Sequence, residues 1–544
     1  MDMRAEEAPD APARQGATGT RSDGPHWQTV VVTAEGFALL LPDGLSASAV
    51  ADALAGELPI VSQKAHTIDR GFWDTFDGRV HGAGLALVEA GGRLVLSDAA
   101  TYAEHAAGVI KRGRARLLAG DLAAGPLRER LEPLIEMRAI MPLARVRSRM
   151  LPLNVLDDIG KIVVRLRVEE PTMLGGDERV ALRARLHVIP VRGYDDEFSR
   201  LEALLARELG LEPTPLTVQD EAVAAAGGTV GGISSKLRLR LDAGVRADVA
   251  AVAIMRRLLE VVELNLPGTL EDTDSEFLHD LRVAVRRTRA LQRELRDVFA
   301  PEPLRVFRDG FKELQRVTGP TRDLDVQLLE FDELAEGLGD GVADDVTPLR
   351  RLLEDHLVVE RRAMVRALRS ERTRALLTNW SDFLDRLVAS GEEGRPDAAA
   401  PVGEVAGRRI AKVYRRMVKM GTAIDDDTPA EALHELRKQG KELRYLLEFF
   451  ASLYAGTVVK PMVASLKDLQ DVLGRFQDRE VQAELLRSLG DEIAALEGGA
   501  AALMAMGVLV QRLAEEQAQA REQFAESFAG FAAKPQRRLV KQTF

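Results

Sequence analysis

The chain has 544 residues, of which 46% are hydrophobic and 29% charged, and it contains no cysteine. This length suffices for two or more domains, and the absence of cysteine excludes disulfides, thiolate zinc sites and cysteine nucleophiles. The net charge of −11, from 74 basic and 85 acidic residues, gives no sign of a polyanionic partner, so such a partner can be recognised only from the local placement of basic residues.

The first 26 residues are polar and lack the apolar stretch of a signal peptide. We therefore expect residues 1–26 to form a disordered tail. No segment has the roughly eighteen consecutive apolar residues that a membrane-spanning helix requires. These features predict a cytoplasmic protein with no membrane partner.

Residues 27–221 alternate between strand-like and helix-like segments, which predicts an α+β domain. The predicted strands lie within Thr29–Leu41, Leu85–Leu96, Lys161–Val168 and Val180–Val191, and the predicted helices are Ser46–Leu58 and Asp196–Leu209. Residues 222–241 begin with a run rich in Ala, Gly and Ser and are predicted to be a linker.

From residue 242 the hydrophobic period becomes that of an α-helix, so residues 242–530 are predicted to be all helical. This region contains an internal repeat, because the segment that begins at His279 aligns without insertions with the one that begins at His434, at an offset of 155 residues. We expect two similar helical bundles, residues 242–389 and 404–530, related by a pseudo-twofold axis. A basic tail, residues 531–544, follows.

Each repeat places a histidine at the head of a basic stripe on one helix face. Arg282, Arg286 and Arg289 follow His279 at helical spacing, and Arg437, Lys441 and Arg444 follow His434. Further basic positions are shared between the halves: Arg257 with Lys412, Arg305 with Lys460, and Lys312 with Lys467. An ordinary solvated helix face mixes charge signs, whereas these stripes are almost wholly cationic and repel along their length. The pattern favours a polyanion site over a solvated face.

The histidines are candidates for hydrogen-bond donors to phosphate, although a capping or packing role is the simpler alternative. A metal site is not expected, since neither histidine has a second ligand at zinc-binding spacing. Asp323 and Asp478 follow turn-like segments, so we interpret them as N-caps or as ion-pair partners of adjacent arginines.

The paired H-x2-R-x3-[RK]-x2-R helices, followed by GPTRDLDV and LGRFQDREV, resemble the conserved-histidine α-helical domain, CHAD. The resemblance covers about residues 242–530. It implies two four-helix bundles around a basic groove that binds inorganic polyphosphate, often on polyphosphate granules with other granule proteins. The residues that match its motif and secondary basic positions are His279, Arg282, Arg286, Arg289, Lys312, His434, Arg437, Lys441, Arg444 and Lys467.

The segment FWDTFDGRVHGAGLALV at 72–88 resembles the CYTH family of triphosphate tunnel enzymes, whose fold is a β-barrel that holds Mg²⁺ or Mn²⁺ through an E-x-E-x-K strand. Here the first strand instead has TVVVT at 29–33, so we expect a degenerate, noncatalytic barrel with no metal or other cofactor. Arginines spaced two apart, such as Arg145, Arg147 and Arg149, either line a cationic lumen or face outward.

Two other functions remain open on sequence alone. One is a metal-dependent triphosphatase that uses Asp74, Glu169 and Glu170 as its carboxylates. The other is nucleic-acid-backbone binding by the same basic groove, against which the aromatic content of 5% counts because single strands are usually held by stacking.

Overall fold

The computed structural model describes residues 36–42, 44–99, 103–110, 113–175, 178–208, 211–214, 216–237, 239–336 and 343–544. The chain divides into two compact units. The first comprises Met1–Phe72, Gly84–Val109 and Ala144–Gly227, and the second Trp73–Ala83, Ile110–Leu143 and Gly228–Phe544. The predicted tail at 1–26 and the segment TVVVT at 29–33 lie outside the described residues.

The N-terminal region contains an antiparallel sheet that, over the described residues, does not close into the predicted barrel. Its strands are β1 (Phe37–Leu40), β2 (Ile60–Ser62), β3 (His66–Thr75), β4 (Leu85–Ala90), β5 (Arg93–Asp98), β6 (Glu104–Val109), β7 (Ile140–Leu156), β8 (Ile162–Gly175), β9 (Glu178–Ala181), β10 (Arg185–Pro190) and β11 (Glu212–Pro213). They follow the order β11-β1-β10-β8-β7-β3-β4-β5-β6, with β2 beside β7 and β9 beside β8. Within the described residues, the end strands β11 and β6 do not pair with each other. Closure of a sheet depends on strand tilt and stagger, which alternation in the sequence does not specify.

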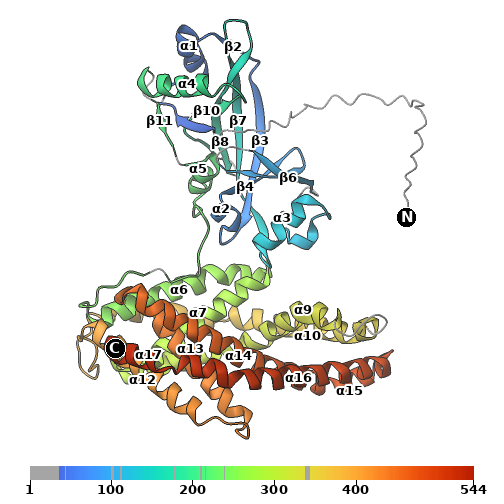
Figure 1. Cartoon of the computed structure of the whole chain (residues 1–544), viewed down its shortest axis with the longest axis vertical. Helices are drawn as coiled ribbons and strands as arrows, with labels where there is room; N and C mark the ends of the chain where they lie inside the picture. The colour runs from blue at the N-terminus through green and yellow to red at the C-terminus, as the bar shows by residue number, and fades with distance from the viewer. Residues whose placement is uncertain are drawn as a thin grey trace, which may run out of the picture. The chain divides into compact units, whose positions relative to one another are not determined.

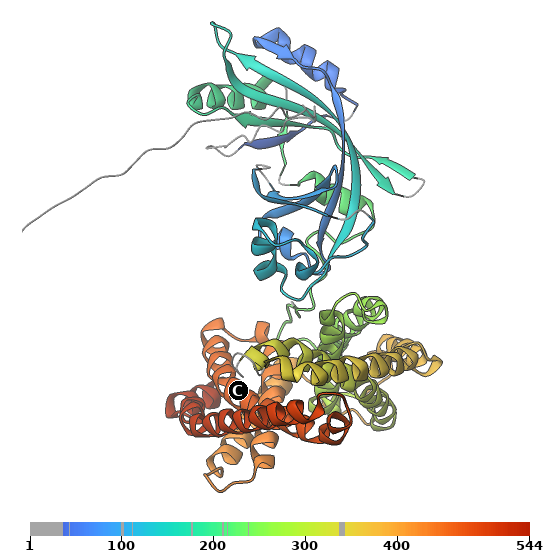
Figure 2. The same ribbon diagram turned by 90° about the vertical axis from the view of Figure 1, so that its right-hand side faces the viewer.

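Two helices cover the same apolar cluster of the first unit, α1 (Ala47–Glu57) and α4 (Asp195–Glu208), and Figure 2 shows the twisted sheet beside them. Leu54 and Leu205 pack with Leu166 and Val188 of the sheet. Helix α1 begins where expected, because Ser46 Oγ accepts a hydrogen bond from the Ala49 amide at 3.2 Å. Helix α5 (Val218–Ala225) extends into the segment predicted as a linker.

The second unit is helical after residue 246. Its long helices are α6 (Ala247–Glu271), α7 (Ser275–Glu294), α8 (Pro301–Val317), α9 (Gly319–Glu336), α10 (Thr347–Leu368), α11 (Glu371–Leu387), α12 (Val402–Thr422), α13 (Ala430–Phe449), α14 (Gly456–Ser488) and α16 (Gly499–Phe531). Short elements are α2 (Arg79–Gly82), α3 (Pro126–Ile135), α15 (Gly490–Ala494), α17 (Lys534–Thr543) and the 3-10 turns η1 (Ala119–Asp121), η2 (Arg296–Val298), η3 (Ala343–Val346) and η4 (Ala451–Leu453). The predicted basic tail therefore contains a helix, α17.

The internal repeat is visible in the helix boundaries. Helices α6, α7 and α8 begin 155 residues before α12, α13 and α14, respectively. The halves differ further on, since α8 ends at Val317 before α9 begins at Gly319, whereas α14 continues to Ser488 without a break. Asp323 and Asp478 consequently lie inside helices, and the prediction that they are N-caps is wrong.

The two halves share their buried core instead of burying two separate ones. One cluster unites Leu281, Phe299 and Trp380 of the first half with Leu436 and Phe450 of the second. A second cluster joins α9 and α10 to α14, α15 and α16; α9, α10, α15 and α16 are labelled on the right of Figure 1. The rigid platform beneath the basic stripes is therefore built by both repeats together.

Helix α7 is fixed at its start by an aspartate that the sequence pattern did not single out. The Asp274 carboxylate accepts hydrogen bonds from the Glu276 and Phe277 amides at 3.0 and 3.2 Å. It also accepts one from the Ala139 amide at 2.9 Å, and Arg138 is ion-paired with Asp280 at 2.5 Å. These contacts join residues 138 and 139 to the start of α7, within the unit that contains Ile110–Leu143 and Gly228–Phe544.

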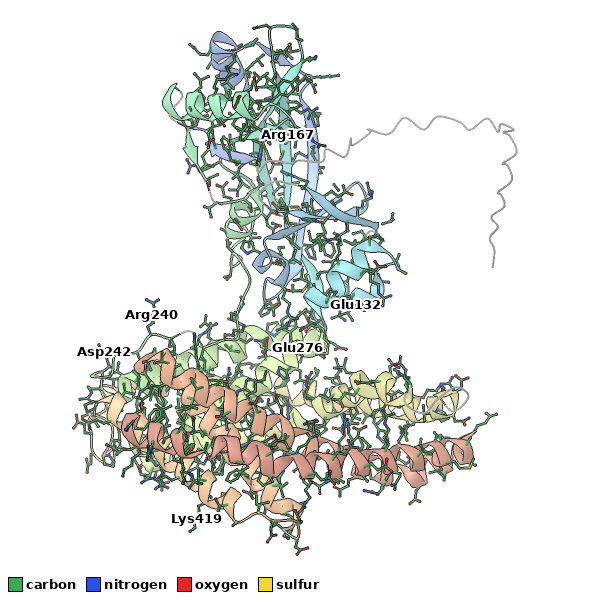
Figure 3. All side chains as sticks on the ribbon, viewed as in Figure 1. Glu132, Arg167, Arg240, Asp242, Glu276 and Lys419 are labelled. Atoms are coloured by element: carbon green, nitrogen blue, oxygen red, sulfur yellow. The ribbon has the colours of Figure 1, made fainter. Side chains whose placement is uncertain are left out.

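Charged residues at helix ends suit the helix dipole. Figure 3 labels Glu276 in the first turn of α7 and the exposed Lys419 in the last turn of α12.

No helix in the described ranges has the length and hydrophobicity of a membrane span.

Candidate functional site

The basic faces of α7 and α13 meet along one groove of about 720 Å³. The two helices contact each other, and both belong to the shared core cluster on their apolar sides. Five of the residues predicted from the sequence line this groove: His279, Arg286, Arg437, Lys441 and Arg444. The groove therefore collects side chains from both repeats.

Arg286 and Lys441 line the groove without an ion pair to any described residue, although Asp280, Asp471 and Asp478 also line it. Arg286 Nε has no hydrogen-bond partner among the described residues. Burial, together with the positive charges of Arg437 and Arg286, lowers the pKa of Lys441 to about 8. The half-buried Gln470 on the groove wall also has two buried amide atoms without a partner in the described structure. This arrangement costs free energy that an anion would recover.

The flanking arginines are held in position by carboxylates. Arg437 is ion-paired with Asp478 at 2.8 Å, and Arg444 with Glu448 at 2.8 Å. Glu448 also pairs with Arg287 of the first repeat at 2.5 Å. Each guanidinium has five N–H donors, so one such contact orients the group and leaves donors for a ligand.

His279 is a neutral hydrogen-bond donor. Its Nδ1 accepts from the Arg322 guanidinium at 3.1 Å, which leaves the ring proton on Nε2. Burial and the nearby charge of Arg322 lower the pKa of His279 to about 4, so the ring is uncharged at neutral pH. Because His279 lines the groove, it can donate from Nε2 to an anion without first binding a proton.

His434 has an equivalent partner but a different environment. Its Nδ1 is hydrogen-bonded to Gln477 Oε1, whose amide nitrogen is occupied by Glu480 at 3.0 Å. Gln477 lies 155 residues after Arg322, so both repeats anchor the histidine from the same helical position. His434 is not among the residues that line the groove. The described residues contain no cluster of three or more metal-ligating side chains, around the histidines or elsewhere.

Arg282 lies beneath the groove. It is buried, and its NH1 group donates to the Gln315 carbonyl and to Thr318 Oγ1, each at 3.0 Å. Burial lowers the pKa of Arg282 to about 10. The residue ties α7 to the end of α8, a structural role that the spacing of the stripe did not reveal.

The other predicted binding residues lie apart from this groove. Arg289, Arg305 and Lys312 line a second cavity, and Lys412 lines a third on α12. Arg257 pairs with Glu260 at 2.6 Å and donates to the Ser234 carbonyl. Lys460 and Lys467 are exposed on α14. The structure thus distributes the predicted set over several surfaces.

Sequence reasoning missed several groove residues: Lys236, Arg287, Gln470 and Arg475. The repeat offset could have identified Gln470, since it pairs with Gln315, but not its position on the wall. Lys236 belongs to the segment predicted as a linker, and nothing in its sequence indicates proximity to α7.

The three carboxylates of the alternative triphosphatase site are already occupied by protein groups. Asp74 accepts hydrogen bonds from the Thr75, Val80 and His81 amides at 2.7 to 2.9 Å. The Asp74 carboxylate, near the end of β3, thereby holds the backbone that follows the strand, and burial raises its pKa. Asp74 belongs to the second unit.

The other two carboxylates, on β8, point to opposite faces of the strand. Buried Glu169 accepts from Ser148 Oγ at 2.6 Å, contacts His187 Nε2 at 2.7 Å and pairs with Arg70. Glu170 accepts from the Ala47 amide at 2.8 Å. This pair does not form a convergent metal site.

Over the described residues the sheet does not close, so its arginines do not line a barrel lumen. Arg147 pairs with Asp69 at 2.7 Å and Arg149 with Glu170 at 2.8 Å, both on an exposed face of β7. Arg185 is fully buried and pairs with Glu221 at 2.8 Å.

Comparisons with known proteins found matches to this chain that include one family model, two relatives and two solved structures. Residues 253–487 match the family model described as the CHAD domain. Two uncharacterized proteins of Mycobacterium tuberculosis, from strains CDC 1551 and H37Rv, are 32% identical over 223 residues. The match covers 39% of this chain and 40% of the length of those relatives.

Two solved structures are also similar. The CHAD domain from the plant Ricinus communis has 27% sequence identity and a TM-score of 0.46, covering 54% of this chain and 94% of that one. PptA from Streptomyces chartreusis has 17% identity and a TM-score of 0.41, covering 52% of this chain and 99% of that one.

Proposed function

We propose that this chain, whose residues 253–487 form a CHAD domain, binds inorganic polyphosphate in the groove between α7 and α13. The observation that carries the proposal is the pair of cations without ion pairs, Arg286 from one repeat and Lys441 from the other, that line the same groove. A linear polyanion neutralises both at once and releases its counterions.

The remaining groove residues suit the same ligand. Arg437 and Arg444 are oriented by single carboxylate contacts and keep donors for phosphate oxygens. His279 adds a neutral Nε2–H donor, and the Gln470 amide adds a second uncharged one. The site therefore offers charge and directional hydrogen bonds along one groove.

The proposed role is binding without catalysis, and it would hold the protein on polyphosphate granules in the cytoplasm. In support, Asp74, Glu169 and Glu170 are each bound by protein groups. The N-terminal region is proposed to be a degenerate relative of the CYTH enzymes. Its resemblance at residues 72–88 supports this assignment, while its open sheet departs from the family's barrel.

The test is a titration of the full chain with fluorescent long-chain polyphosphate, in competition with DNA of equal phosphate concentration at one fixed salt concentration. The double variant Arg286→Gln, Lys441→Met should bind about a hundredfold more weakly, since each charged hydrogen bond contributes roughly 1.5 kcal/mol or more. Lys438→Met is the matched control, because Lys438 is exposed on the same helix and pairs with Glu435 at 2.6 Å. Preferential binding of DNA, or equal losses in the control, would refute the proposal.

A further inference from the structure

A second basic cavity, of about 430 Å³, lies between α7 and α8 of the first half. Five cations line it, with Asp309 as the one acidic residue among the lining side chains: Arg289, Arg293, Arg305, Arg308 and Lys312. Arg289, Arg308 and Lys312 make no ion pair in the described part of the chain. This pocket therefore concentrates uncompensated positive charge in a smaller volume than the groove does.

Two of the five cations are already neutralised. Arg293 pairs with Glu442 at 2.5 Å, and Arg305 pairs with Glu302 at 3.1 Å. The guanidinium of Arg289 donates to the Gln315 side chain, which orients it without cancelling its charge.

A buried amide on the wall of this pocket has no partner. Gln292 is 0% exposed, and neither its Nε2 nor its Oε1 makes a hydrogen bond in the described structure. A buried amide without partners costs about 1–3 kcal/mol, so an occupant that satisfies it is stabilised. The Nε2 group can donate to an anionic oxygen that enters the pocket.

The second repeat keeps only part of this chemistry. At the offset of 155 residues the cations Arg289, Arg305 and Lys312 correspond to Arg444, Lys460 and Lys467. In contrast, Gln292 corresponds to Leu447, Arg308 to Val463 and Arg293 to Glu448. The buried amide and two of the five cations are therefore features of the first half alone.

The pocket continues the ligand-facing side of α7. Arg289 and Arg293 follow the groove residue Arg286 by three and seven positions, which places them along one helix face within roughly 10 Å of axial rise. A chain leaving the groove along α7 reaches this pocket next.

We propose that the pocket binds the terminal phosphate of a polyphosphate whose body lies in the groove, an inference that rests on the function proposed above. A terminal phosphate carries close to two negative charges at neutral pH, since phosphomonoesters have a second pKa of about 6 and nearby cations lower it further. An internal phosphate carries one charge. Three cations without ion pairs, together with a buried amide N–H that lacks an acceptor, match the more highly charged end of the chain.

The experiment compares long-chain polyphosphate with free ends and the same chain with both terminal phosphates capped as monoesters, at pH 7 and fixed salt. The wild-type chain should bind the capped polymer about tenfold more weakly. Gln292→Leu and Arg308→Val, which install the residues of the second repeat, should remove the difference while Lys438→Met retains it. Circular dichroism and melting check the fold, and Gln292→Leu should not destabilise because it removes an unsatisfied amide.

Excess pyrophosphate should lower the affinity for the free-ended chain to that for the capped chain. Equal wild-type affinity for the two polymers would overturn the inference. This holds even if pyrophosphate still binds, because the pocket would then bind a free phosphate ion and not the end of the polymer. Failure to bind either polymer would instead refute the proposed function, so the two failures are distinguishable.

Discussion

Raising the pH should weaken polyphosphate binding through one residue, Lys441. Its pKa of about 8, against 10.5 for an ordinary lysine, results from burial and from Arg437, Arg286 and Arg444. The negative charge of a bound polyanion favours the protonated lysine and raises its pKa again, so binding takes up a proton wherever the free side chain is deprotonated. Internal phosphates do not titrate in this range.

The magnitude follows from the same pKa. A group with a pKa of about 8 is roughly nine-tenths neutral at pH 9 and one-tenth neutral at pH 7, so affinity should fall about tenfold between these values. The assay is isothermal titration of the full chain with long-chain polyphosphate at pH 7, 8 and 9, in two buffers of different ionisation enthalpy. The buffers should report uptake of close to one proton at pH 9.

Lys441→Arg is the matched control, because an arginine stays charged throughout this range. The variant should bind at pH 7 and lose the pH dependence. Flat wild-type affinity from pH 7 to 9, or the same fall in the variant, would refute the reasoning that Lys441 is a perturbed cation inside the site.

Three further predictions concern stability and catalysis. Lys441→Met should raise the free energy of unfolding by about 1 kcal/mol at pH 7, because the lowered pKa means that the folded state holds this proton less tightly than the unfolded state. The gain should vanish as the pH rises from 8 towards 10.5, which denaturant titrations at pH 7 and at pH 10.5 can check. Arg282→Met should cost about 1–3 kcal/mol in thermal or denaturant unfolding, because the Gln315 carbonyl and Thr318 hydroxyl lose their donor; an unchanged melting curve with weakened binding would place Arg282 in the binding site instead. Incubation with tripolyphosphate and Mg²⁺ or Mn²⁺ should release no phosphate, and release abolished by Asp74→Ala would establish an enzyme.

The sequence predicts the helical unit well because its signal is local and duplicated. Hydrophobic period and the 155-residue offset are properties of the chain itself, and α7 and α13 begin at positions related by that offset. The meeting of Arg286 and Lys441 also follows from pairing the repeats. The burial of Arg282 cannot be predicted from the sequence in the same way. The spacing of the stripe shows which face of α7 the arginine lies on, but not how deeply the neighbouring α8 covers that face.

The N-terminal region shows where such reasoning stops. The alternation in Leu85–Leu96 predicts a strand, and the structure divides this segment into the hairpin of β4 and β5. Whether a sheet closes depends on stagger between strands far apart in sequence, which no alternation pattern encodes. Likewise, Arg138 contacts Asp280 across 142 residues, so its grouping with the helices is a tertiary property.

The most direct test of the central claim is charge reversal in one repeat at a time. Arg286→Glu and Lys441→Glu should each weaken polyphosphate binding severely and to a comparable degree, because one chain contacts both helices. Each should also reduce the salt dependence of binding. The slope of log affinity against log salt concentration should become shallower by roughly 0.7 for each phosphate that the variant no longer neutralises. If reversal in either repeat leaves the affinity and the salt slope unchanged while circular dichroism shows a folded protein, the groove is an ordinary solvated face and the account is wrong.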